Sequence, residues 1–397
     1  MLLFLLFCLT FKQRGCITFC GKFDMENVAK KPNFVLAFIK KNIVFSIATI
    51  AAILSCFFVL PDAQYIDYFD FKTLVSLFVM LAVISALRHI SFFRILANKI
   101  IKLFKTTRSA ITALVFITYF ASMLIANDMA LITFLPLGYF VLATTKKEKY
   151  MAFTFIMQTI AANLGGMITP FGNPQNLYIY NTFNIATAEF FAIMWKPTVV
   201  SIVLIVICCM FIKNEPLECG KTTNKKLDVK KALIYFAFFA YAIVIVFRVV
   251  PYWTGLLIIP VLYFLDKQAV FDVDYILLLT FCMFFIFSGN LARIPAVNEF
   301  FANLLGKNTL LTGVLSCQVI SNVPSAILLS GFTADYANLL VAVNIGGCGS
   351  LISSLASLIT FKHFTLYQPG NTKKYLVLAH ALNFCFLAVL VATSFLL

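Results

Sequence analysis

Ala126-Asn127-Asp128 and Ser321-Asn322-Val323-Pro324 are short polar stretches that interrupt long apolar runs of this chain. Each is followed by a second interruption, Gly172-Asn173-Pro174-Gln175-Asn176 in the first case and Asn344-Ile345-Gly346-Gly347 in the second. Amides and helix breakers at corresponding places in the apolar segments of two halves point to a binding site near the middle of a membrane. These four stretches therefore decide the predicted fold.

The composition is that of an integral membrane protein. Of the 397 residues 62% are hydrophobic and only 12% are charged, and the mean hydropathy is +0.96. Soluble domains have about 45–50% apolar and about 25% charged residues. The formal charge of +15 lies in the loops between apolar runs, where it reports membrane topology. We therefore expect the lipid bilayer as a partner and no binding of nucleic acid.

The beginning of the chain is expected to lie outside the membrane. The apolar stretch 1–11 has no basic segment before it and no small-residue cleavage site after it, so no signal peptide is predicted. Residues 1–42 are interpreted as a cytoplasmic N-terminal segment. Met25 precedes a basic segment and is a candidate start, in which case residues 1–24 would be a misread extension.

Apolar runs of roughly membrane length follow. A hydrocarbon core needs about 20 residues of helix, and the predicted spans are 43–60, 73–87, 150–180, 191–212, 233–250, 255–265, 275–291, 335–361 and 375–397. Segments 109–145 and 309–333 carry Asn127 and Asn322 and are predicted to be helical hairpins that enter and leave the membrane on one side.

Loop charge is the basis of the hairpin prediction. Basic residues flank segment 109–145 on both sides: Arg88, Arg94, Lys99, Lys102, Lys105 and Arg108 precede it, and Lys146, Lys147 and Lys149 follow it. Cytoplasmic loops are enriched in Lys and Arg, so both of its ends are predicted to be cytoplasmic. Counting spans onward, segment 309–333 enters and leaves from the outside, where Asp335 lies. The two hairpins are therefore expected to dip from opposite faces.

The order of elements predicts an internal repeat. Each half has a span opened by an Asp, an amphipathic stretch (92–104 or 297–305), a hairpin and a broken helix. The predicted fold is an all-α polytopic membrane protein with two inverted-topology repeats, each with a re-entrant hairpin and a broken transmembrane helix. The predicted units are repeat 1 at 43–212, a cytoplasmic linker at 213–231 and repeat 2 at 232–397.

Broken helices inside a membrane have a direct chemical consequence. Their freed N–H and C=O groups would each cost several kcal/mol in hydrocarbon, so they must line a cavity or a bound solute. Helix N-termini carry partial positive charge and suit an anion, while carbonyl and amide oxygens suit Na⁺. One site can therefore hold a small anion and its coupling cation.

At these positions the sequence resembles the ion transporter superfamily, which includes divalent-anion/sodium symporters, citrate transporters, arsenite permeases and related sodium/proton antiporters. The resemblance covers about residues 70–180 and 274–366. The symporters carry Ser-Asn-Thr at each hairpin tip, where this chain has Ala126-Asn127-Asp128 and Ser321-Asn322-Val323.

The resemblance extends to the broken helices. The family's Gly-Thr-Pro-Pro-Asn loop is matched by Gly172-Asn173-Pro174-Gln175-Asn176, and its second copy by Gly347-Cys348-Gly349-Ser350. Both tip Thr residues are absent and the second loop lacks Pro-Asn, so dicarboxylate specificity does not carry over. The resemblance implies a transport domain that moves like an elevator against a scaffold, and a possible homodimer.

The candidate site residues are those of the tips and breaks. The resemblance implies that Asn127 and Asn322 contact substrate and coordinate a coupling cation, with Na⁺ at Asn127, Asp128 and Asn322 as one expectation. Asp128 is read either as a Na⁺ ligand or proton carrier, or as a helix cap. The full set is Asn127, Asp128, Asn163, Gly172, Asn173, Pro174, Asn176, Ser321, Asn322, Asn344, Gly347 and Ser350.

Several functions remain open from the sequence. The favoured one is a secondary active transporter of a small anion, carboxylate-like or an inorganic oxyanion, coupled to Na⁺ or H⁺, in the plasma membrane of a prokaryote. The alternative is a Na⁺/H⁺ antiporter or an arsenite-type efflux permease on the same fold. A channel or membrane enzyme is a third class, but no nucleophile–base pair, H-E-x-x-H pattern or nucleotide-binding loop is present, so no enzyme and no cofactor besides bound Na⁺ is expected.

Overall fold

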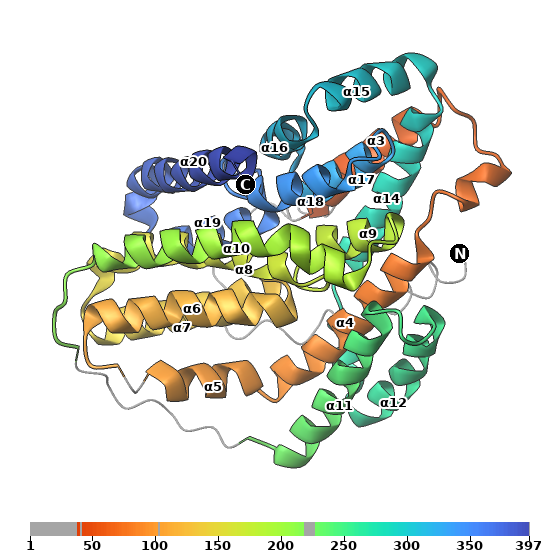
Figure 1. Ribbon diagram of the computed structural model, residues 1–397. Helices are drawn as coiled ribbons and strands as arrows, with labels where there is room; N and C mark the ends of the chain where they lie inside the picture. The colour runs from red at the N-terminus through yellow and green to blue at the C-terminus, as the bar shows by residue number, and fades with distance from the viewer. Residues whose placement is uncertain (1–37, 40–41, 102–103, 218–226, 397) are drawn as a thin grey trace, which may run out of the picture.

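The computed structural model describes residues 38–39, 42–101, 104–217 and 227–396, and this part of the chain is all-helical (Figure 1). Eight of its helical segments are long and apolar enough to cross a membrane, so the protein is an integral, multi-pass membrane protein. Residues 1–37, most of the predicted N-terminal segment, lie outside the described residues, as does 218–226 of the predicted linker.

The helices occur in two series that have the same kinds of element in the same order. The first series is α3 (Ile43–Ser55), α4 (Phe71–His89), α5 (Phe92–Ile101), the hairpin α6 (Thr107–Ile125) and α7 (Asn127–Thr144), the broken pair α8 (Met151–Gly165) and α9 (Pro174–Thr182), and α10 (Thr187–Met210). The second is α11 (Val229–Val246), α12 (Ile258–Leu265), α13 (Lys267–Phe271), α14 (Tyr275–Ala292), α15 (Pro295–Lys307), the hairpin α16 (Thr309–Ile320) and α17 (Asn322–Ser330), the broken pair α18 (Tyr336–Ile345) and α19 (Leu355–Tyr367), and α20 (Thr372–Leu396). The inverted, re-entrant arrangement in the membrane stays a prediction.

The two hairpins differ in length. Helices α6 and α7 have 19 and 18 residues, about 27 Å each, whereas α16 and α17 have 12 and 9 residues. Each helix of the first hairpin is long and apolar enough to cross a membrane, by length and composition. The corner of this hairpin lies beside Asn163 near the end of α8, so its length follows that of the helix it packs against.

Short polar side chains fix where the spans begin. Asp70, Asp274 and Asp335 are the N-caps of α4, α14 and α18, and each carboxylate accepts a hydrogen bond from a backbone N–H of the first turn. Pro174 is the first residue of α9, where its missing N–H costs nothing. The predicted role of Asp70 and Asp274 as the residues that open corresponding spans is confirmed.

The helices form two groups. We call α6–α10 with α16–α20 the hairpin group, and α3, α4 and α11–α14 the scaffold group; each packs mainly within itself, and α5 and α15 connect them (Figure 1). In the scaffold group the two series exchange partners, because α3 packs on α14 and α11 packs on α4. Asn290 on α14 donates to the Ser55 hydroxyl on α3 (3.0 Å), which pairs two buried polar side chains.

Ion pairs join loops that were predicted to lie on the same side of the membrane. Arg293, after α14, and Asp62, between α3 and α4, are 2.6 Å apart, and the region after 275–291 is predicted to lie on the same side as Asp335. Lys147 and Lys149, predicted inside, both bind Glu215 at the start of the linker, at 2.5 and 2.8 Å. These contacts agree with the predicted grouping of loops, and the assignment of one face to the cytoplasm stays a prediction.

Glu215 gives a first testable prediction. Hydrogen bonds from Lys147 and Lys149 lower its pKa from 4.5 to about 2. The lowered pKa means that the attachment stabilises the fold above about pH 4.5 and is lost as the pH falls toward about 2. We expect Glu215→Gln to remove it at neutral pH and to speed hydrogen exchange of the Thr107 and Leu217 amides, which bond across this junction.

The matched control is Glu148→Gln, because no hydrogen bond to the Glu148 carboxyl is found in the described residues. Exchange at Thr107 and Leu217 that is equally fast in both variants would contradict the role of Glu215.

Candidate functional site

Asn163 joins the first hairpin to both broken helices. Its Oδ1 accepts a hydrogen bond from Asn127 Nδ2 (3.0 Å) at the hairpin corner. Its own Nδ2 donates to the Gly347 carbonyl (3.2 Å) and to Ser354 Oγ (2.9 Å) in the second break. Asn163 is 1% exposed, so these bonds replace water that the side chain has lost.

Asn344, near the end of α18 in the second broken helix, binds residues of the first break. Its Oδ1 accepts from Asn173 Nδ2 (3.2 Å) and Gln175 Nε2 (3.4 Å), and its Nδ2 donates to Asn176 Oδ1 (2.5 Å). Asn163 and Asn344 thus each reach the residue that precedes the second helix of the opposite break. The two breaks are therefore linked in both directions by buried amides.

The second hairpin corner is attached to the same place. The Asn322 N–H donates to the Ser353 carbonyl (2.9 Å), and Ser321 Oγ donates to that oxygen as well (3.3 Å). Ser353 Oγ in turn donates to the Gly347 carbonyl (2.8 Å), the oxygen that Asn163 also binds. We call this set of corners and breaks the twin-corner site.

The two corners have the same backbone geometry. Ala126 lies at φ 62°, ψ 149° and Ser321 at φ 74°, ψ 159°, a region that L-residues rarely adopt. In both corners the next Asn side chain folds back, so that Asn127 Oδ1 accepts from the Asp128 N–H and Asn322 Oδ1 from the Val323 N–H, each at 2.9 Å. These Asn side chains therefore act as caps, and an amide oxygen still has a second lone pair.

Three buried oxygens at the site accept no hydrogen bond from the described residues: Asp128 Oδ1, Asn173 Oδ1 and Gln175 Oε1. The Asp128 N–H donates to Asn127 Oδ1, and both readings of the Asp128 carboxylate, as a coupling group or as a helix cap, stay predictions. Buried acceptors without partners are costly and attract a cation or a hydrogen-bond donor.

Two glycines let the hairpins approach the broken helices. A Cβ on Gly165 would lie 2.3 Å from the Tyr119 carbonyl oxygen of α6, and one on Gly346 would lie 2.9 Å from Cys317 Sγ of α16. Both distances are shorter than any ordinary contact, so the close approach of hairpin and break requires glycine at both places.

The other predicted residues lie around this network. Pro174 begins α9, and the Gly172 N–H donates to the Thr169 carbonyl in the preceding loop. Asn176 Nδ2 lies 3.1 Å from each of three loop carbonyls, so its amide supports the break. Ser350 contacts Gln318 of α16 and makes no hydrogen bond to either corner.

The candidate set from the sequence leaves out Gln175, Ser353, Ser354 and Gln318. Gln318 holds the second break, since it bonds the Gly346 and Cys348 carbonyls and the Ser350 N–H. A signal for Ser354 exists in the sequence. Asn163-Leu164-Gly165-Gly166 matches Asn344-Ile345-Gly346-Gly347, and the number of residues from Asn163 to Asn173 equals that from Asn344 to Ser354.

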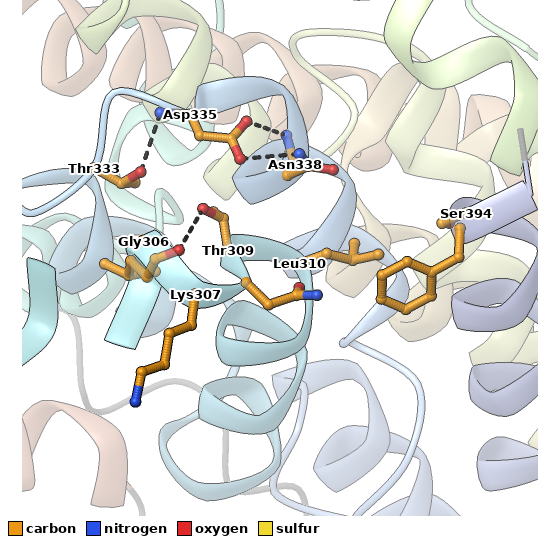
Figure 2. Close-up of a pocket in the computed structure, with 11 residues that line it drawn as sticks. Gly306, Lys307, Thr309, Leu310, Thr333, Asp335, Asn338 and Ser394 are labelled. Carbon is orange, nitrogen blue, oxygen red and sulfur yellow. Dashed lines mark hydrogen bonds between the residues drawn. The ribbon is translucent and has the colours of Figure 1, made fainter. Parts of the chain in front are cut away.

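A hollow of about 450 Å³ lies elsewhere, between the α15–α16 corner, the start of α18 and the end of α20 (Figure 2). Two of its polar side chains bond within the protein: Thr309 Oγ1 donates to the Leu305 carbonyl, and the Asp335 carboxylate accepts from the N–H and Nδ2 of Asn338. Lys307 points away from Asp335 in this view. We therefore assign the candidate site to the twin corners.

A polar site made of interrupted helices within an apolar bundle defines the class of membrane transporters. The sequence model described as Citrate transporter (CitMHS) matches residues 34–346, and the chain belongs to this family. A protein of Methanocaldococcus jannaschii named as an uncharacterized transporter is 32% identical over 326 residues, 81% of this chain and 89% of that protein. The inner membrane protein YbiR of Escherichia coli is 29% identical over 304 residues, 74% of this chain and 80% of that protein. These similarities indicate a transporter and not an enzyme.

Gly165 provides a prediction about the site. We expect Gly165→Ala to force α6 away from α8 and to lower the thermal stability of the purified protein, with a cost of about 1–3 kcal/mol as for an overpacked core. Gly306→Ala is the control, because an added Cβ there meets nothing within 4 Å. Equal melting temperatures for both variants would contradict the close packing of hairpin and break.

Proposed function

We propose that this protein is a secondary active transporter of a small anion, carboxylate-like or an inorganic oxyanion, coupled to Na⁺ or H⁺. The observation that carries the proposal is the twin-corner site, in which two hairpin corners and two helix breaks are joined by buried amides. Such an arrangement gives one site both the positive ends of helices and free acceptor oxygens.

Helix N-termini supply the attraction for an anion. Helices α7, α9, α17 and α19 all begin at the site. The N-cap residues of α7, α9 and α17 make no side-chain cap, although Asn127 and Asn322 each accept from one first-turn N–H of α7 and α17. First-turn N–H groups and the helix dipole favour a bound anion. The description Citrate transporter of the matching family supports a carboxylate among the candidates.

Acceptor oxygens supply the attraction for a coupling cation. Asp128 Oδ1, Asn173 Oδ1 and Gln175 Oε1 are buried without partners, and Asn127 Oδ1 retains a lone pair. Carboxylate and amide oxygens are ligands of hard cations, and a carboxylate can instead carry a proton. An anion and a cation bound together would offset each other's charge inside the membrane.

The division into two groups supports alternating access by an elevator-type movement. The whole site lies in the hairpin group, which meets the scaffold group where α9 packs on α4 and α17 packs on α14. A movement of one group along the other would carry the site as a unit and leave its internal bonds intact.

Uptake into liposomes tests the proposal. We expect at least one of labelled succinate, citrate, sulfate or arsenite to enter faster with an inward Na⁺ or H⁺ gradient. Asn127→Ala and Asn322→Ala should each reduce this uptake by about tenfold or more, because each removes a polar group from the site. Asn371→Ala, an exposed position, is the control. Unchanged uptake in both site variants would rule out the twin-corner site.

Asp128 favours a second candidate, a Na⁺/H⁺ antiporter or arsenite-type permease, because its carboxylate lacks a partner at Oδ1. We expect Asp128→Asn to change the Na⁺ or pH dependence of transport while the protein remains folded, as the amide keeps the shape and loses the charge. If neither dependence changes, Asp128 is not the coupling group. Collapse of Na⁺ and H⁺ gradients against each other without anion uptake would favour the antiporter.

A further inference from the structure

Arg248 belongs to the scaffold group, and its side chain binds the end of the first broken helix. It lies in the turn after α11, and its guanidinium donates to the Tyr180 carbonyl, to the Ile185 carbonyl (3.1 Å) and to Asn184 Oδ1 (2.8 Å). The same group stacks over the Tyr180 ring at 4.0 Å. All of these partners belong to the end of α9 and the loop that follows it.

A second polar contact holds the same end of α9 from α4. Asn181 Nδ2 donates to Thr73 Oγ1 (3.0 Å), and Thr73 Oγ1 donates to Asp70 Oδ2 (2.6 Å). Thr73 is fully buried and Asn181 is 8% exposed, so the contact excludes water. The end of α9 is therefore held between α4 and the turn after α11.

The turn that carries Arg248 is closed by backbone hydrogen bonds. The Arg248 N–H bonds the Ile245 carbonyl (2.9 Å) and the Val249 N–H bonds the Val244 carbonyl (3.2 Å), which closes a tight turn on the end of α11. Arg248 adopts φ 59°, as such a turn requires. Its side chain thus reaches from a fixed point of the scaffold group to the hairpin group.

The acceptors of Arg248 are neutral, which makes the contact reversible. Arg248 binds two carbonyl oxygens, an amide oxygen and an aromatic ring, all of them neutral. When its guanidinium leaves them, water can replace these partners, and no charged group is left unpaired. Arg293 differs, because it pairs with the charged Asp62 and with Tyr68, and both partners lie in the loop between α3 and α4 of the scaffold group.

We propose that Arg248 is a latch that holds the site in the position seen here, and that the latch must open before the hairpin group can move along the scaffold group. The proposal rests on the proposed elevator movement. It assigns to Arg248 control over which side of the membrane the site faces, through the end of α9 and without contact with the solute.

The latch can be tested without knowledge of the solute. Thr73→Cys places a thiol under Asn181, where a hydrophilic thiol reagent reaches it only when α9 leaves α4. We would measure the labelling rate at position 73 by mass spectrometry of the purified protein in nanodiscs, with Arg248 intact, with Arg248→Gln and with Arg248→Lys. The control is Arg293→Gln, which breaks a contact within the scaffold group. The buried native thiols of Cys317 and Cys348 report any unfolding.

We expect Arg248→Gln to raise the labelling rate at position 73 by about tenfold or more, because it removes the charge-assisted hydrogen bonds of the guanidinium, while Cys317 and Cys348 stay unlabelled. The labelling rate of Arg248→Lys should lie between that of the protein with Arg248 intact and that of Arg248→Gln. Lysine keeps the positive charge but lacks the planar guanidinium that binds several acceptors at once. Arg293→Gln should leave the rate unchanged. Equal rates in all Arg248 variants would overturn the latch. Failure of anion uptake in liposomes would leave this result standing, so the two proposals fail separately.

Discussion

The fold depends on one constraint, which is that backbone polar groups freed inside an apolar bundle must find partners within the protein. Four interruptions free such groups, at Ala126, Ser321 and the two breaks. The partners are amides and hydroxyls exchanged between the two series of helices: Asn163 reaches the second break and Asn344 reaches the first. This exchange makes the interruptions tolerable, and it also draws the helix N-termini to one place.

Much of this could be predicted from the sequence. The helical class, the order of the apolar segments and the N-cap role of Asp274 before α14 follow from hydropathy and N-cap residues, which are local signals, while the re-entrant course of the two hairpins stays a prediction. The pairing of Asn163 with Asn127 could not be predicted, because it depends on how far α6 and α8 run side by side. Ser353 and Ser354 were missed since their sequence lacks the Pro and Asn of the first break. The spacing from Asn344 could have indicated Ser354, whereas the role of Ser353 follows only from its packing against Asn322.

Polar side chains within the hairpin group differ from those at its border with the scaffold group. Within the hairpin group, buried amides link the two corners and the two breaks to one another. Between the groups, the described polar contacts include those at the end of α9, Arg88 with Met129 Sδ on α7, and Ser288, which donates to the Ile327 carbonyl of α17 (3.0 Å). The proposed elevator movement would break only the contacts of this second kind and would leave the bonds within the site intact.

The crosswise packing of the scaffold bears on how the chain is made. Helix α3 packs on α14, and Ser55 meets Asn290, which is 235 residues later in the sequence. At a synthesis rate of about 5–20 residues per second, α3 waits roughly 10–50 s for α14. During that time the Ser55 hydroxyl lacks the amide of Asn290 as a partner. Assembly of the scaffold is therefore a late event in biogenesis, and truncated chains that end before Asn290 cannot complete it.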